Sequence, residues 1–283
     1  MGPGREQRTA VVTGAASGIG RALAEELARR GVAVTLADRD VAGVEEAADR
    51  IRAGGGSAQA RELDVRDVAR FREVVQEVDD RAGRLDYLFN NTGIGVGGEA
   101  HDYDPADWDD VIDVNLRGVA HGILAAYPRM RTRRSGHIVN TASMAGLVPG
   151  VFQLSYAATK HAVVGLSKAL RIEARPHGVR VTVLCPGVIR TPILAGGRFG
   201  RLKVGVAPER AMALFERLRP MDPARFARVA LRGVDRNQAI VIAPAWWRLL
   251  WWLERLSPSL GERLASAGAD RLRRELEQAR SGS

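Results

Sequence analysis

The feature that most constrains the fold is a glycine-rich turn close to the N-terminus. It follows an apolar run over residues 10–12 and opens a pattern typical of a helix over residues 19–30. The turn reads Thr13-Gly14-Ala15-Ala16-Ser17-Gly18-Ile19-Gly20. Gly14 permits a sharp turn, Gly18 lets the backbone approach a ligand closely, and Gly20 lets the helix pack on the strand. A strand, this turn and a helix in succession predict the first unit of a doubly wound α/β fold.

The helix after the turn also determines what the turn can bind. Its first N–H groups are unpaired and carry a partial positive charge, which favours the pyrophosphate of a dinucleotide. The alternative is a glycine-rich turn that binds no ligand.

Asp38 ends the second expected strand, 18 residues after Gly20. An acid about 20 residues after this turn accepts hydrogen bonds from the adenosine ribose, and its charge repels a 2′-phosphate. We therefore expect NAD to be preferred over NADP, although Arg39 follows directly and could pair with such a phosphate. The alternative is that Asp38 caps the next helix.

Apolar runs and helical patterns alternate along the rest of the chain. Strands are expected over residues 10–12, 32–37, 57–62, 87–89, 137–141, 179–184 and 239–242. Helices are expected over residues 19–30, 41–52, 65–82, 105–130, 155–174 and 224–234. This alternation predicts an α/β single-domain Rossmann-type doubly wound parallel sheet of about seven strands in the order 3-2-1-4-5-6-7. Residues 1–243 would form this catalytic and dinucleotide-binding domain, with a substrate loop over about 193–223, and residues 244–283 a C-terminal helical extension.

Composition excludes several other kinds of protein. The 283 residues carry a formal net charge of +9, but the basic side chains are scattered among acids, so we expect no nucleic-acid partner. The one cysteine, Cys185, is interpreted as a buried thiol and fits a cytoplasmic protein. We find no apolar run of about 18 residues for a spanning helix, and no metal-ligand cluster.

Further motifs follow the glycine-rich turn in a fixed order. They are Asp64-Val65, Asn90-Asn91-Thr92-Gly93, Asn115, Ser143, Tyr156-Ala157-Ala158-Thr159-Lys160, Cys185-Pro186-Gly187-Val188 and Thr191. With the turn, they make residues 9 to 193 resemble the short-chain dehydrogenase/reductase family. Thr92 departs from the family's usual alanine and would add a hydroxyl near the cofactor.

The resemblance implies a catalytic set and a dinucleotide site. The catalytic set is Asn115, Ser143, Tyr156 and Lys160. The cofactor-binding residues are Gly14, Ser17, Gly18, Ile19, Gly20, Asp38, Arg39, Asp64, Val65, Asn91, Thr92, Gly93, Tyr156, Lys160, Pro186, Gly187, Val188 and Thr191. The implied function is an NAD(P)-dependent oxidoreductase that moves a hydride between nicotinamide and a secondary alcohol or ketone, with an apolar substrate. The alternatives are an NADPH-dependent ketone reductase and a non-catalytic dinucleotide-sensing protein on the same fold.

The spacing of the tyrosine and the lysine suits this chemistry. Four residues apart on a helix, Tyr156 and Lys160 share one face. A free tyrosine has a pKa of about 10, so we expect the ammonium and an oxidised nicotinamide to favour the phenolate. Ser143 would stabilise charge on the reacting oxygen. Asn115, as the family resemblance implies, would hold a water that relays protons from Lys160.

Four of the five tryptophans lie within residues 246–252, in a helical pattern that is apolar on almost every side. The pattern is expected to begin near Pro244 and to end near Pro258. Three interpretations stay open: a core helix, an interface of a homodimer or homotetramer, and a peripheral contact at the inner face of a membrane. We expect that one protomer cannot bury all four tryptophans. We also expect that replacing Trp247 and Trp251 changes assembly or membrane binding and leaves the nicotinamide site intact.

Overall fold

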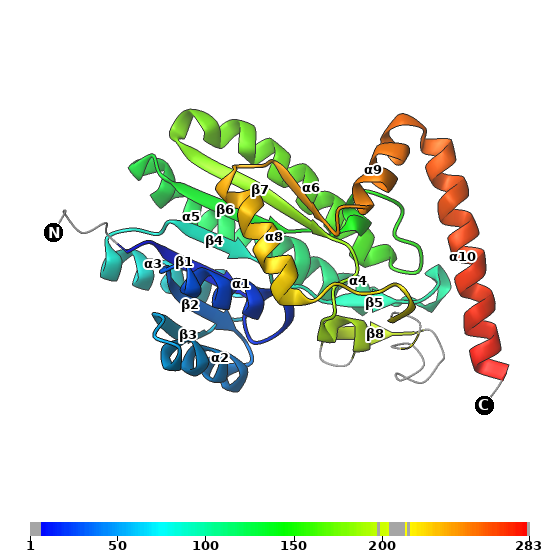
Figure 1. Cartoon of the computed structure of the whole chain (residues 1–283), viewed down its shortest axis with the longest axis horizontal. Coiled ribbons are helices and arrows are strands. Elements are labelled where there is room, and N and C mark those ends of the chain that lie inside the picture. Colours follow the sequence, from blue (N-terminus) through cyan, green and yellow to red (C-terminus); the bar gives the residue numbers. More distant parts are fainter. Residues whose placement is uncertain (1–6, 197–198, 204–212, 214–215, 282–283) are drawn as a thin grey trace.

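The computed structural model describes residues 7–196, 199–203, 213 and 216–281. A seven-stranded sheet crosses the centre of the molecule (Figure 1). Its strands are β1 (Thr9–Thr13), β2 (Ala33–Asp38), β3 (Ala58–Glu62), β4 (Tyr87–Asn90), β6 (Gly136–Thr141), β7 (Val179–Pro186) and β9 (Ile240–Ala243). Their order is β3-β2-β1-β4-β6-β7-β9, and every pairing is parallel. Numbered by these seven strands alone, this order is the expected 3-2-1-4-5-6-7.

Helices cover both faces of the sheet, which explains why its strands are apolar on both sides. One face packs against α1 (Gly18–Arg29), α2 (Val41–Ala53) and α8 (Pro223–Asp235). The other packs against α3 (Val68–Ala82), α5 (Gly118–Arg133) and α6 (Leu154–Ala174). Two hydrophobic cores therefore hold the sheet between them, and the carboxyl ends of its strands stay open for a site.

Two segments depart from the expected elements. The single helix expected over 105–130 is α4 (Pro105–Ile112), a π-helical turn (Asp113–Arg117) and then α5. The loop expected over 193–223 contains a short strand, β8 (Gly200–Leu202), which pairs in parallel with β5 (Gly95–Gly97). These three-residue strands contain glycine and lack an apolar alternation that would reveal them. Residues 197–198, 204–212 and 214–215 of the expected loop lie outside the described residues.

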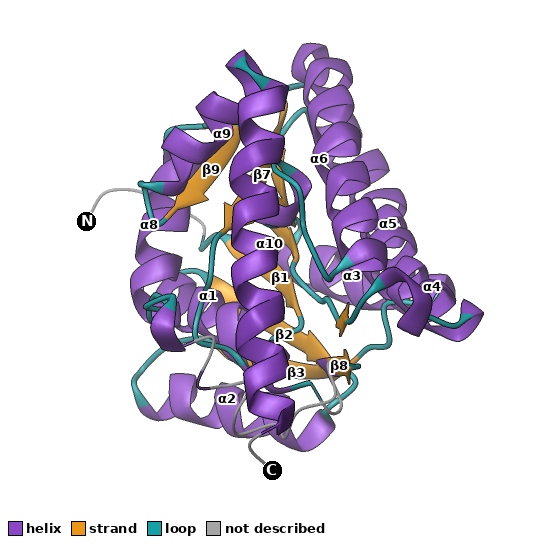
Figure 2. Ribbon diagram, turned by 90° about the vertical axis from the view of Figure 1, so that its right-hand side faces the viewer, coloured by secondary structure: helices purple, strands orange, loops and turns teal. Residues whose placement is uncertain are grey.

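The chain ends in two helices, α9 (Trp247–Leu256) and α10 (Pro258–Ser281). Figure 1 shows α10 along one side of the molecule, and Figure 2, which faces that side, shows α10 in front of the sheet. Among the described residues, no helix is long and apolar enough to cross a membrane.

Of the four clustered tryptophans, two face solvent and two face the sheet. They lie on the α9 region, which is α9 together with the preceding residue Trp246. Trp246 and Trp252 are 55% and 52% exposed, which confirms that this chain alone does not bury all four. Trp247 and Trp251 pack inward against a core cluster that contains Cys185. Both indoles lie on the side of the sheet, and the expectation that replacing Trp247 and Trp251 spares the nicotinamide site stays a prediction.

Strand β6 carries a buried imidazole, His137, that makes the stability of the fold depend on pH. Its Nε2 lies 2.9 Å from the Thr182 hydroxyl, which itself donates to the carbonyl of Gln238. Nε2 must then carry the ring proton, because the Thr182 hydroxyl can only accept there. Burial, together with the charges of Arg180 and Arg171, lowers the pKa of His137 from 6.5 to about 3.

Stability should therefore depend on His137 in mildly acidic solution. Between pH 6.5 and pH 3 the unfolded chain binds a proton that the folded chain excludes, so the free energy of unfolding falls as pH falls through that window. We expect a slope approaching about 1.4 kcal/mol per pH unit. Urea unfolding between pH 7 and pH 5 should show this slope in the wild type and its loss in His137→Gln. The matched control is His161→Gln on an exposed helix face; equal slopes in all three proteins would contradict the assignment.

Candidate active site

A cavity of about 1070 Å³ opens at the carboxyl ends of the strands. Doubly wound sheets bind ligands at this edge, and the volume is at the upper end for small-molecule sites. The cavity extends from the glycine-rich turn to α10. Every residue expected to be catalytic or cofactor-binding lines it, except Gly20 and Asn115.

The turn has the shape that its glycines predict. Gly14 and Gly18 have φ of +67° and +56°, in the left-handed region where glycine carries no penalty. A Cβ on Gly20 would lie 2.1 Å from the Gly14 carbonyl oxygen, so only glycine fits where α1 meets the turn. Gly20 is absent from the cavity wall because its role is this packing.

Asp38 is fixed against the turn. Its carboxylate accepts hydrogen bonds from the backbone N–H groups of Ala16 (3.2 Å) and Asp40 (3.1 Å). The cap of α2 is Asp40 instead, whose side chain accepts from the N–H of Gly43. Asp38 is therefore not a helix cap, and its carboxylate lines the cavity.

Asp64 also lines the cavity and pairs with Arg66, whose Nε lies 3.0 Å from both carboxylate oxygens. Hydrogen bonds from Arg66 hold the pKa of Asp64 below its usual value, and the charge of Arg39 lowers it further. Arg39 therefore lies close enough to Asp64 for the two charges to interact. At neutral pH, Asp64 is therefore an ionised carboxylate with basic neighbours in the cavity wall.

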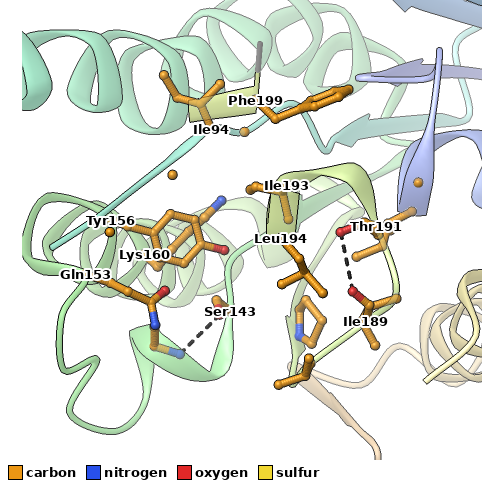
Figure 3. A pocket seen from close by; sticks show the side chains of 18 of the residues that line it. Ile94, Ser143, Gln153, Tyr156, Lys160, Ile189, Thr191, Ile193, Leu194 and Phe199 are labelled. Carbon is orange, nitrogen blue, oxygen red and sulfur yellow. Dashed lines mark hydrogen bonds between the residues drawn. The ribbon is translucent and has the colours of Figure 1, made fainter. Parts of the chain in front are cut away.

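Three of the four expected catalytic side chains come together. Figure 3 shows the Tyr156 hydroxyl turned toward Ser143, with Lys160 behind the tyrosine ring. The Lys160 Nζ lies 5.3 Å from the centre of that ring and donates to the Thr141 carbonyl at 2.9 Å. The Ser143 hydroxyl accepts from the N–H of Ala145, which fixes its direction.

Burial changes the pKa values of both members of the Tyr156–Lys160 pair. Burial raises the pKa of Tyr156 above its usual value, and the hydrogen bond with Ser143 offsets only part of that rise. Burial also lowers the pKa of Lys160 to about 8. Among the chain's own groups, removal from water therefore outweighs the interactions that favour the phenolate. The expectation also includes the charge of an oxidised nicotinamide, so it stays a prediction. At neutral pH the phenol carries its proton.

Asn115 lies behind the cavity wall, fully buried in the π-helical turn. Its amide donates to the carbonyl of Ile94 and accepts from the N–H of the same residue, both at 2.9 Å. A Cβ on Gly93 would lie 3.3 Å from both the Asn115 Oδ1 and the Lys160 Nζ, so the two groups lie close to one glycine. The side chain of Asn115 holds the segment after β4; a role in proton relay stays a prediction.

The thiol of Cys185 is buried on β7 beside this group. Burial raises its pKa to about 12, so the sulfur stays protonated and does not act as a nucleophile. This agrees with its interpretation as a structural thiol.

An ion cluster fixes the loop that carries β8. Asp107 on α4 is fully buried and pairs with Arg201 and with Lys203. Burial raises the pKa of Asp107, but hydrogen bonds from Lys203, the backbone N–H of Asp104 and Arg201 outweigh burial and lower the pKa to about 2. Because β8 is held in this way, Phe199 and Leu202 form part of the cavity wall.

Motif analysis missed the far side of the cavity. Trp247 packs so closely on Gly187 that a Cβ there would lie 2.1 Å from the indole Nε1. From α10, the side chains of Leu272 and Leu276 also line the cavity. The available signal was the spacing of Leu272 and Leu276, four residues apart among the charged residues of the second half of α10.

Comparison with known proteins identifies the class. Residues 8–198 match the family model of the short chain dehydrogenases, and the chain belongs to this family. It is 44% identical over 195 residues to a monensin polyketide synthase putative ketoacyl reductase from Streptomyces virginiae, covering 68% of this chain and 75% of that one. It is 37% identical over 187 residues to the oxidoreductase UcpA from Escherichia coli K12, covering 66% and 71%.

Solved structures agree with this assignment. A short chain dehydrogenase/reductase from Burkholderia phymatum in complex with NAD is similar with a TM-score of 0.79 and 28% identity, covering 90% of this chain and 95% of that one. A short-chain dehydrogenase from Sphingobium yanoikuyae in complex with NADPH gives 0.73 and 29%, covering 92% and 95%. The protein is an NAD(P)-dependent dehydrogenase/reductase.

Proposed function

We propose that this enzyme transfers a hydride between a nicotinamide dinucleotide and a secondary alcohol or ketone with an apolar body. The observation that carries the proposal is the meeting of Ser143, Tyr156 and Lys160 in the cavity that also contains the glycine-rich turn. A non-catalytic dinucleotide-sensing protein would not require a buried tyrosine and lysine at this place.

The residues present fit a dinucleotide. The N–H groups at the start of α1 would bind the pyrophosphate, and Asp38, which lines the same cavity, would bind the adenosine ribose. Lys160 would contact the second ribose, and the wall from Pro186 to Thr191 would contact the nicotinamide. When bound, the nicotinamide supplies the site that accepts or gives the hydride.

The chain's own groups handle the proton. Ser143 and Tyr156 hydrogen-bond the substrate oxygen, which places its carbon for hydride transfer. In reduction, the Tyr156 hydroxyl gives its proton to that oxygen; in oxidation, the phenolate takes the proton back. Lys160, with a pKa of about 8, is mainly protonated at pH 7 and stabilises the phenolate by its charge. The raised pKa of Tyr156 suits reduction at neutral pH, because the proton donor is already loaded.

The first test replaces Tyr156 by Phe. We expect turnover to fall by about 10²–10⁴-fold or more, because the acid/base is lost, while the Kd for dinucleotide changes little. Lys160→Ala should lose both turnover and binding.

In the wild type, alcohol oxidation should rise with pH and ketone reduction should fall as Tyr156 loses its proton. Steady-state rates and calorimetry measure these quantities. Turnover by Tyr156→Phe at the wild-type level would refute the mechanism.

We also propose that NAD(H) is preferred over NADP(H), with an NADPH-dependent ketone reductase as the alternative. The Asp38 carboxylate is held in place by two backbone N–H groups, so it cannot easily turn away from a 2′-phosphate. Arg39 interacts with the charge of Asp64, which opposes its use as a phosphate partner.

The second test measures both dinucleotides against Asp38→Ser. The wild type should bind NAD(H) more tightly, and the variant should move the ratio of the two Kd values by about tenfold or more toward NADP(H), since a like charge is removed. Asp40→Ser is the matched control, because it removes a neighbouring carboxylate that caps α2. A wild type that already favours NADP(H) would overturn the assignment of Asp38.

A further proposal concerns assembly: we propose that the outward face of the α9 region contacts a second copy of this chain. Trp246, Leu249, Trp252 and Leu256 are each more than half exposed and recur at helical spacing. The exposed Arg248 and Arg255 flank them. An apolar centre rich in tryptophan with arginines at its rim is the composition of a protein interface.

We propose the cytoplasm as the location, consistent with the buried, unpaired Cys185.

The third test replaces Trp246 and Trp252 together by Ser. Light scattering should show a shift to smaller species. The dissociation constant of the subunits should rise by about tenfold or more, because two side chains at the centre of the interface are lost. Dinucleotide binding should persist, since neither indole lines the cavity. Val41→Ser on α2, an exposed apolar residue elsewhere, serves as the control. A monomeric wild type would contradict the proposal, and flotation of that monomer with anionic vesicles would assign the face to lipid.

A further inference from the structure

Helix α10 forms one wall of the cavity, far from the catalytic tyrosine in the sequence. Gly268, Arg271, Leu272, Glu275 and Leu276 all line the cavity. Leu272 and Leu276 are four residues apart and share one face, and Leu276 is only 9% exposed. The whole helix lies beyond residue 198, where the match to the family ends.

The surfaces that surround this part of the cavity are mainly carbon. Side chains from three other segments complete the apolar lining: Val151, Phe152, Ile193, Leu194, Phe199, Leu202 and Trp247. The charged residues in this part of the lining pair with one another, since Glu275 lies 3.1 Å from Arg271 and 3.5 Å from Arg217. Polar groups that could bind an oxygen gather instead at Tyr156 and Ser143 (Figure 3).

One aromatic residue of the lining is held in an unusual conformation by its contacts. Phe152 has a φ of +60°, which is rare for a bulky residue and persists only where the surroundings impose it. Its carbonyl accepts from the N–H of Gly98 at 3.0 Å. The guanidinium of Arg273 on α10 lies 5.6 Å from its ring centre, and Arg273 also donates to Glu99 at 3.1 Å. Phe152 and α10 therefore hold each other in place.

We propose that α10 is a distal substrate subsite that binds the apolar end of an elongated secondary alcohol or ketone. This inference rests on the proposed function. Leu272 and Leu276 contact the far end of the substrate while its oxygen lies at Tyr156. Gly268 keeps room beside them, because a Cβ there would meet no atom within 4 Å. A short ketone would leave this wall in water and gain nothing from it.

The test fills that room without straining the fold. Gly268→Leu places a side chain at the cavity wall, and glycine is a poor helix former, so the thermal midpoint should not fall. Gly165→Leu is the matched control: Gly165 is an exposed glycine of α6, also has no atom within 4 Å of a Cβ, and does not line the cavity. Both full-length variants are assayed with a series of linear 2-ketones and 2-alcohols of about 4 to 12 carbons, in which each member is two methylenes longer than the one before.

In the wild type and in Gly165→Leu, kcat/KM should rise about fourfold for each methylene that is buried. In Gly268→Leu the longest substrates should lose at least about tenfold, whereas the shortest should change less than about twofold. Calorimetric binding of the longest alcohol, in the presence of reduced dinucleotide, should weaken in the same variant alone.

The outcomes separate the two proposals. Tyr156-dependent turnover with the same chain-length profile in Gly268→Leu as in the wild type would overturn the subsite and leave the proposed function standing. Absence of turnover, with the longest alcohol binding the wild type and not Gly268→Leu, would overturn the proposed function and leave the subsite standing. Failure of the longest alcohol to bind the wild type would overturn the subsite.

Discussion

The contact between Gly20 and the carbonyl of Gly14 constrains the rest of the structure. No side chain fits between them, so α1 starts directly against the end of β1. The helix N-terminus then faces the open edge of the sheet, with its partial positive charge directed at the cavity. Because β1 lies between β2 and β4, the residues after all three strands share that edge. Asp38 and the Asn91–Gly93 turn reach the cavity for this reason.

A second constraint lies beneath the catalytic group. Asn90 on β4 donates to Asn140 on β6 at 2.9 Å, and Asn140 donates to Ser167 on α6 at 3.0 Å. This buried series of hydrogen bonds links two strands to the helix that carries Tyr156 and Lys160. Buried polar groups tolerate few alternative arrangements, so the series fixes the position of α6 along the sheet. The precision of the site therefore depends on side chains that the cavity does not expose.

The sequence predicted those parts of the molecule that depend on local pattern. Runs of β-branched and aliphatic residues located the seven strands, and motif order located the residues that line the near side of the cavity, from the glycine-rich turn to Thr191. Interactions between distant segments were not predictable in this way. The π-helical turn accompanies the pairing of Asn115 with Ile94, 21 residues away, and the β8 loop depends on the contact between Asp107 and Arg201, 94 residues apart.

Periodicity also left the direction of a helix face open. The segment from Trp246 to Trp252 is apolar on almost every side, so only its packing shows which two indoles face the sheet. The raised pKa of Tyr156 could not be predicted from the sequence either, because it depends on burial. Spacing placed Lys160 beside the ring, but it could not show how completely both groups leave water.

The position of α10 in the chain has an evolutionary consequence. The sheet is complete at β9, before α9 and α10 begin, and no strand hydrogen bond depends on either helix. Mutations in α10 that keep the contacts of Arg273 with Phe152 and Glu99 can therefore accumulate without disturbing the turn or the sheet. Proteins that descend from one ancestral gene can then keep the same hydride transfer while the sequence of this terminal helix diverges.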